Sequence, residues 1–94
     1  MLETSFVQRQ RKRLLWRLTS YAMEIRNGDL PNHMRAHKAH MLREVIPTVL
    51  ARIDDGCYGS CIKCGVEIPK HRLELIPDAL RCVHCQSQID QKRS

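Results

Sequence analysis

The sequence predicts a mainly α-helical fold, in which an antiparallel, coiled-coil-like helical hairpin precedes a small four-cysteine module with minimal β structure. Three observations indicate this fold. Two long segments repeat apolar residues at helical spacing, a break containing Gly and Pro separates them, and two Cys-x2-Cys pairs follow. We therefore divide the 94 residues into a helical hairpin over residues 1–55 and a cysteine module over residues 56–94, which ends in a short helix.

The first helix is predicted over about residues 3–26. Its apolar residues recur at alternating steps of three and four, as on one face of an amphipathic helix. The charged Arg11 occupies one position of this pattern. Ser5 followed by Gln8 fits a capping box at the start. The predicted apolar face consists of Val7, Leu14, Leu18, Tyr21 and Ile25.

A break at residues 27–32 separates this helix from the next. Gly28 can adopt the left-handed conformation that ends a helix, and Pro31 cannot continue one. A break this short between two amphipathic helices favours an antiparallel hairpin.

The second helix is predicted over about residues 33–54, with Asn32 as its N-cap. Pro47 lies inside it, removes one backbone donor and crowds a preceding carbonyl, which predicts a kink or two shorter helices meeting there. The predicted apolar face consists of Met34, Met41, Leu42, Val45, Ile46, Val49, Leu50 and Ile53.

The cysteine pairs have the spacing of a metal site. Cys61 and Cys64 form one pair, Cys82 and Cys85 form the other, and 17 residues separate the pairs. Two intervening residues let both sulfurs of a pair point at one ion, and the spacer is long enough to bring the pairs together. Four thiolates predict one structural zinc ion, with iron as the main rival occupant, and they leave no position open for a substrate.

Signs of catalysis and of membrane insertion are missing from the sequence. It has no phosphate-binding Gly loop, no His-Glu-x-x-His motif and no nucleophile elbow, so we expect neither an enzyme nor a small-molecule substrate. No apolar run approaches the roughly 20 residues of a membrane span, and the N-terminus lacks the layout of a secretory signal. We therefore expect a cytoplasmic protein, in which clustered cysteines are metal ligands more often than disulfides.

Two further groups of residues leave alternatives open. Cys57 fits a small turn residue best, but an oxidisable thiol or a substitute ligand is also conceivable. His33, His37 and His40 recur on one helix face and could hold a second metal ion. Without a nearby cysteine or carboxylate on that face, we favour a solvated stripe.

The basic residues are concentrated in the N-terminal half. The net charge is +6, and residues 1–47 hold nine Lys and Arg against four Asp and Glu. A basic run could grip phosphates, but its side chains, spread through a helix, would point in several directions, so a solvated face is the preferred interpretation. The run contains Arg9, Arg11, Lys12 and Arg13.

Several short matches in residues 49–90 go beyond the cysteines. They are Arg52-Ile53, Gly56, Tyr58-Gly59, Arg72-Leu73, Pro77, the 17-residue spacing and the Cys-x2-Cys-Gln at residues 82–86. Together they resemble the DksA/TraR family of bacterial regulators.

This resemblance implies a four-cysteine zinc finger beside a helical hairpin, and transcriptional control by direct contact with RNA polymerase. Family members insert the hairpin into the secondary channel of the polymerase, with acidic residues at its tip. Here the tip holds one acid, Asp29, where the best-known members carry a pair. We therefore expect a zinc-binding transcription regulator that contacts RNA polymerase. The alternative is a basic zinc-finger adaptor that binds nucleic acid directly through the basic run.

Overall fold

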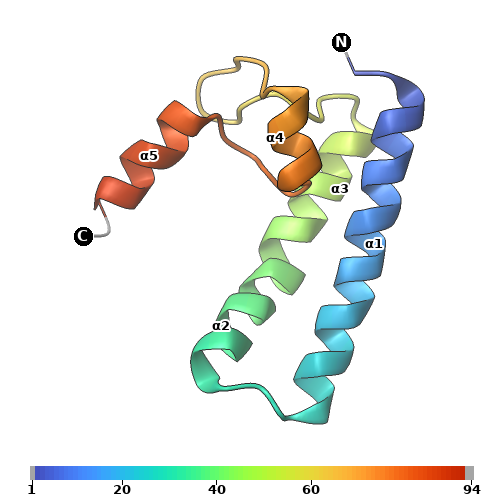
Figure 1. The fold of residues 1–94 in the computed structure, drawn as a ribbon, viewed down its shortest axis with the longest axis vertical. Helices are drawn as coiled ribbons and strands as arrows, with labels where there is room; N and C mark the ends of the chain where they lie inside the picture. Colours follow the sequence, from blue (N-terminus) through green and yellow to red (C-terminus); the bar gives the residue numbers. More distant parts are fainter. Residues whose placement is uncertain (1, 93–94) are drawn as a thin grey trace.

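A computed structural model, which describes residues 2–92, consists of helices joined by loops (Figure 1). Helix α1 (Thr4–Asn27) runs antiparallel to a second rod, which is built from α2 (Asn32–His40), a π-helical turn η1 (Met41–Val45) and α3 (Ile46–Asp54). Two shorter helices, α4 (Lys70–Leu75) and α5 (Val83–Lys92), follow at the end of the hairpin opposite its tip. This arrangement confirms the predicted mainly helical fold, whereas the boundary at residues 55 and 56 stays a prediction.

Helix α1 ends as predicted but begins differently. Gly28 adopts the left-handed conformation, with φ of 76°, and its N–H donates to the carbonyl of Ile25 at 3.3 Å. At the other end Glu3 is the N-cap, without a side-chain capping bond, and Ser5 lies inside the helix. The predicted capping box at Ser5 is therefore wrong.

The second rod accommodates Pro47 through its π turn. Pro47 is the second residue of α3, and the N–H of Ile46 donates to the carbonyl of Met41, five residues earlier. A wider turn just before a proline relieves the clash between its ring and the carbonyl four residues back. The predicted pair of shorter helices is present, but Pro31 rather than Asn32 occupies the N-cap of α2.

Two apolar clusters hold the structure together. Leu14 packs with Met41, Ile46 and Val49 between the two rods. Phe6 packs with residues of the cysteine module at the base of the hairpin, where the cluster contains Ile68, Leu73 and Ala79. Because Phe6 belongs to α1, the cysteine module shares its core with the hairpin.

A buried polar network fixes the same contact. Gln10, only 2% exposed, donates through Nε2 to the carbonyl of Leu73 at 2.6 Å and to the Tyr58 hydroxyl at 3.1 Å. The Tyr58 hydroxyl donates in turn to the carbonyl of Pro77 at 2.9 Å. Burial raises the pKa of Tyr58, so the hydroxyl stays protonated and able to donate.

Regular β structure is minimal, as predicted. Within residues 2–92 it consists of one isolated antiparallel bridge between Ser60 and Glu67. The N–H of Ile68 donates to the carbonyl of Gly59 at 2.7 Å on the same side of the loop. This pairing closes the loop that carries the first cysteine pair.

Candidate metal centre

The first cysteine pair lies on a tight turn. The N–H of Cys61 donates to the carbonyl of Val66 at 2.8 Å, and the N–H of Gly65 donates back to the carbonyl of Cys61 at 2.9 Å. Gly65 has a φ of 80°, which a residue with a side chain rarely adopts. The turn therefore depends on glycine directly after the second cysteine of the pair.

The second pair lies where the chain enters α5. Cys82 precedes the helix and Cys85 lies in its first turn, where the N–H of Cys85 points at the sulfur of Cys82 at 3.5 Å. The N–H of Ile62 donates to the carbonyl of Leu80 at 2.8 Å, which ties the first turn to the segment that leads into the second pair. Backbone hydrogen bonds thus bring the two pairs together.

The four sulfur atoms converge on one point. The Sγ atoms of Cys61, Cys64, Cys82 and Cys85 all lie within 4.8 Å of one another, and those of Cys64 and Cys82 are 3.8 Å apart. Four thiolates at about 2.3 Å from one ion, placed at the corners of a tetrahedron, lie about 3.8 Å apart. The donor set and its spacing therefore fit one zinc ion.

The thiols differ in their affinity for protons. Burial works to raise the pKa of Cys61, but hydrogen bonds with Cys82, Cys64 and Lys63 outweigh it and lower the pKa to about 5. Burial and hydrogen bonds with the other thiols raise the pKa of Cys85 to about 12. Without a metal ion, Cys61 is therefore the sulfur that loses its proton most readily, and Cys85 is the one that keeps it most strongly.

Cys57 and the histidine stripe remain outside this centre. Within residues 2–92 the four cysteines are the one group of three or more metal-binding side chains that the fold brings together. Cys57 is half-buried, and its carbonyl accepts a hydrogen bond from Arg52 at 3.2 Å. His40 lies 3.1 Å from a carboxylate oxygen of Glu44, and His33 and His37 are exposed.

The residues predicted to contact partners are divided between the two ends of the hairpin. Asp29 is exposed at the tip, and the basic run lies beside the cysteine module (Figure 1). Arg11 faces Asp54 of α3 at 3.8 Å, whereas Arg9, Lys12 and Arg13 are exposed on the outside of α1. The structure therefore does not combine Asp29 and the basic residues into one site.

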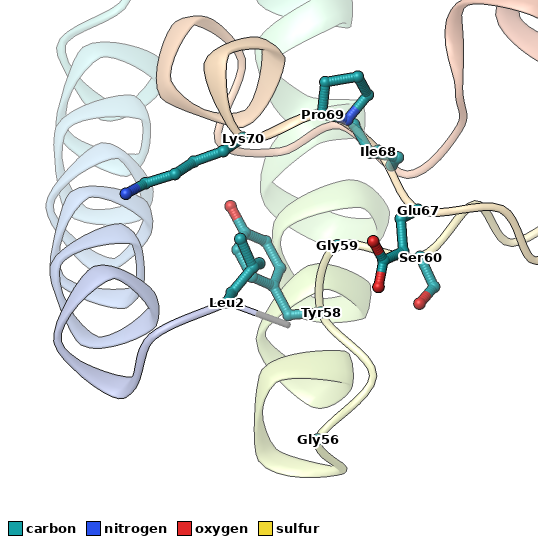
Figure 2. A pocket seen from close by; sticks show the side chains of 9 residues that line it. All are labelled: Leu2, Gly56, Tyr58, Gly59, Ser60, Glu67, Ile68, Pro69 and Lys70. Carbon is teal, nitrogen blue, oxygen red and sulfur yellow. The ribbon is translucent and has the colours of Figure 1, made fainter.

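Sequence reasoning missed a cavity beside the first cysteine turn (Figure 2). Its volume is 630 Å³, and its lining includes Leu2, Tyr58, Glu67 and Lys70. Figure 2 shows the Lys70 side chain extending toward α1, where its Nζ lies 5.0 Å from the centre of the Phe6 ring. The lining residues lie far apart in the sequence, so no local motif indicates the cavity.

The structure also bears on membrane insertion. Among the helices of residues 2–92, none combines the length and the apolar character that crossing a bilayer requires.

Residues 56–91 match the prokaryotic DksA/TraR C4-type zinc finger. General stress protein 16O of Bacillus subtilis is 32% identical over an alignment that covers 78% of this chain and 53% of that protein. The RNA polymerase-binding transcription factor DksA of Escherichia coli is 33% identical over 67 residues, which cover 71% of this chain and 39% of that protein. An uncharacterized protein of Aquifex aeolicus is 41% identical over 51 residues, 54% of this chain and 34% of that protein. The chain thus spans from a third to about half the length of these relatives.

Two solved structures share the fold. The RNA polymerase binding protein and transcriptional regulator Dks of Chlamydia trachomatis superposes with a TM-score of 0.79 at 26% identity, over 98% of this chain and 95% of that one. DksA2 of Pseudomonas aeruginosa superposes with a TM-score of 0.54 at 24% identity, over 95% of this chain and 81% of that one, and this likeness concerns the fold alone. The zinc-finger match and the converging sulfurs agree on the cofactor, which is one structural zinc ion.

Proposed function

The chain belongs to the DksA/TraR family, and from this premise we propose that it is a transcription regulator that binds RNA polymerase directly. One observation carries the proposal. The hairpin and the zinc finger together superpose on a polymerase-binding regulator over almost the whole of both chains. The likeness therefore concerns the arrangement of the two parts as well as the zinc finger.

The hairpin has the form that insertion into a narrow channel requires. Helix α1 has 24 residues, which corresponds to a rod of about 36 Å. The tip is narrow, because only residues 28–31 connect the two rods. Asp29 is exposed there, and no ion pair within residues 2–92 neutralises its carboxylate. The hairpin would carry this one negative charge toward the active site of the polymerase.

The zinc finger holds the base of that rod. We assign Cys61, Cys64, Cys82 and Cys85 as the zinc ligands, with residues 56–94 as the zinc-finger module and residues 1–55 as the hairpin. The closed four-sulfur site gives the ion a structural role without catalysis. Phe6 and Gln10 connect the zinc-finger module to α1, because both side chains of α1 pack against the module. Polymerase binding also implies a cytoplasmic protein.

A pull-down of RNA polymerase tests the proposal. The zinc-loaded protein, immobilised through an affinity tag, is incubated with purified bacterial polymerase, with and without nuclease treatment. Retention of polymerase in both samples is expected, since the contact is between proteins. Retention that disappears after nuclease treatment would show that nucleic acid mediates the contact, and it would contradict the proposal.

A further inference from the structure

The outer surface of α1 beside the zinc finger carries an unusual combination of side chains. Arg9, Lys12, Arg13 and Trp16 stand at positions i, i+3, i+4 and i+7, so they share one face of the helix. All four are exposed, and Trp16 is 74% exposed although it is the one tryptophan of the chain. We call these four residues the basic face.

The fold separates this face from the rest of the basic run. Arg11 turns to the opposite side, where it meets Asp54 of α3 at 3.8 Å. Within residues 2–92 no ion pair neutralises Arg9 or Lys12. The basic run therefore divides, with Arg11 on one side of the helix and Arg9, Lys12 and Arg13 on the other.

A groove runs along the basic face. Its volume is 460 Å³, and three cations, one aromatic ring, one amide and one carboxylate line it: Arg9, Lys12, Arg13, Phe6, Gln10 and Glu74. Arg13 is held in place because Nη1 donates to Gln10 Oε1 and to the carbonyl of Glu74, each at 2.9 Å. Lys70, at the start of α4, brings a further cation to the Phe6 ring, with its Nζ 5.0 Å from the ring centre. The groove thus has one cation held by hydrogen bonds, Arg13, and two further cations beside the Phe6 ring, whereas Glu74 is its one acid.

From this arrangement we infer that the basic face binds single-stranded nucleic acid, a property beyond the proposed contact with polymerase. Cations track a phosphate backbone, and an exposed aromatic ring stacks on a base of any sequence. Arg9 to Trp16 spans about 10 Å along the helix, enough to face a few nucleotides. Paired bases cannot reach the Trp16 ring from within a duplex, which selects a single strand.

An acidic protein is the competing partner. A stable protein interface needs an apolar centre within a contact of about 800 Å² per partner. Trp16 is the one apolar side chain of the basic face, and the other three members are cations. A single stacking ring among cations suits a nucleic acid strand better.

Fluorescence provides a direct test, because Trp16 is the only tryptophan. The zinc-loaded full chain is titrated with oligothymidylate of about 20 nucleotides, a length that exceeds the site of one small binding module. Quenching of Trp16 is expected, with affinity that falls steeply between about 50 and 200 mM salt. A duplex of the same length and polyglutamate serve as competitors, and neither should displace the strand at equal charge concentration.

Variants distinguish binding at the basic face from a general effect of net charge. The readout is the fluorescence anisotropy of a labelled oligothymidylate. Trp16→Ala should weaken binding about tenfold, and Trp16→Phe should lose less because a ring remains. The logarithm of the binding constant falls linearly with the logarithm of the salt concentration, and the double variant Arg9→Gln, Lys12→Gln should make this slope shallower by about 1.4. The control Arg26→Gln, Arg43→Gln removes the same charge from exposed positions elsewhere and should bind like the parent.

Three results would overturn the inference. They are unchanged Trp16 fluorescence at saturating oligothymidylate, equal losses in the two double variants, and displacement of the strand by polyglutamate. The last result would assign the basic face to an acidic protein. None of these depends on polymerase, so the pull-down described above succeeds or fails independently.

Discussion

The side-chain amide of Gln10 donates a 2.6 Å hydrogen bond to the backbone carbonyl of Leu73, 63 residues away, and links the hairpin to the zinc finger. Glutamine is rarely buried, and this one is 2% exposed. Its amide also reaches the Tyr58 hydroxyl, which in turn holds the carbonyl of Pro77. A buried network of this kind specifies one orientation between two elements, because any other orientation leaves polar atoms without partners.

Replacing Gln10 should destabilise the protein. Gln10→Leu leaves the buried Leu73 carbonyl and the Tyr58 hydroxyl without their donor, so the free energy of unfolding should fall by about 1–3 kcal/mol. Urea unfolding of the zinc-loaded protein measures this loss. Gln8→Leu, at an exposed position two residues earlier, is the control and should change stability by less than about 0.5 kcal/mol. Equal effects of the two changes would show that the network contributes nothing.

Removing zinc should loosen the start of α1 as well as the finger. Phe6 is buried against Ile68, Leu73 and Ala79, and this cluster loses its support when the metal-bound turns open. Hydrogen exchange in excess chelator should therefore increase across the finger and the first turns of α1. The half of α1 near the tip, which packs through Leu18 and Tyr21 on the second rod, should keep its protection.

Two cysteine variants serve as controls for that experiment. Cys82→Ala should reproduce the exchange pattern of the chelated protein, since it removes one of the four converging sulfurs. Cys57→Ala should retain one zinc per chain and the exchange pattern of the parent, because Cys57 lies outside the cluster. Loss of zinc from Cys57→Ala, measured by elemental analysis, would contradict the assigned ligand set.

The parts of this fold that depend on local sequence could be predicted, and the parts that depend on distant contacts could not. Gly28 and Pro31 predict the break between the two helices, because their backbone preferences do not depend on distant contacts. The cysteine spacing predicts the metal site, because a turn with two intervening residues is enough to direct two sulfurs at one ion. Leu14, Leu18 and Tyr21 were identified by their period, since they face the second rod as an ordinary amphipathic stripe does.

The burial of Phe6 and Gln10 could not be predicted from the helical period, for a physical reason. Helix α1 packs on two neighbours, the second rod and the zinc finger, so its buried surface is wider than one stripe near the N-terminus. A glutamine at position 10 is predicted to be solvent-exposed from sequence alone, because its hydrogen-bond partner, the carbonyl of Leu73, is distant in the chain. The capping box at Ser5 is wrong because the helix already begins at Thr4, with Glu3 as its N-cap, so Ser5 lies inside the helix.

Zinc binding should release protons near neutral pH. In the metal-free cluster the pKa of Cys61 is lowered to about 5 and that of Cys85 is raised to about 12, so Cys85 holds a proton that zinc must displace. As the pH falls, protons compete with zinc for the sulfurs, so the affinity and the stability that zinc adds both decrease. Calorimetry in two buffers with different ionisation enthalpies should give different apparent heats. Identical heats in both buffers would mean that no proton is released.

Neutralising the acid at the hairpin tip should weaken regulation without affecting the fold. Asp29 is exposed and unpaired within the described chain, so Asp29→Asn should leave zinc content and unfolding unchanged. If the tip charge acts near the polymerase active site, this variant should lose most of its effect on an in vitro transcription assay while still binding polymerase. Asp55→Asn removes the same charge from an exposed position at the opposite end of the hairpin and should regulate like the parent. Because both variants carry the same net charge, a difference between them assigns the effect to the position of Asp29. Equal regulation by Asp29→Asn and the parent would exclude the tip carboxylate as the acting group, even if the pull-down shows that polymerase is bound.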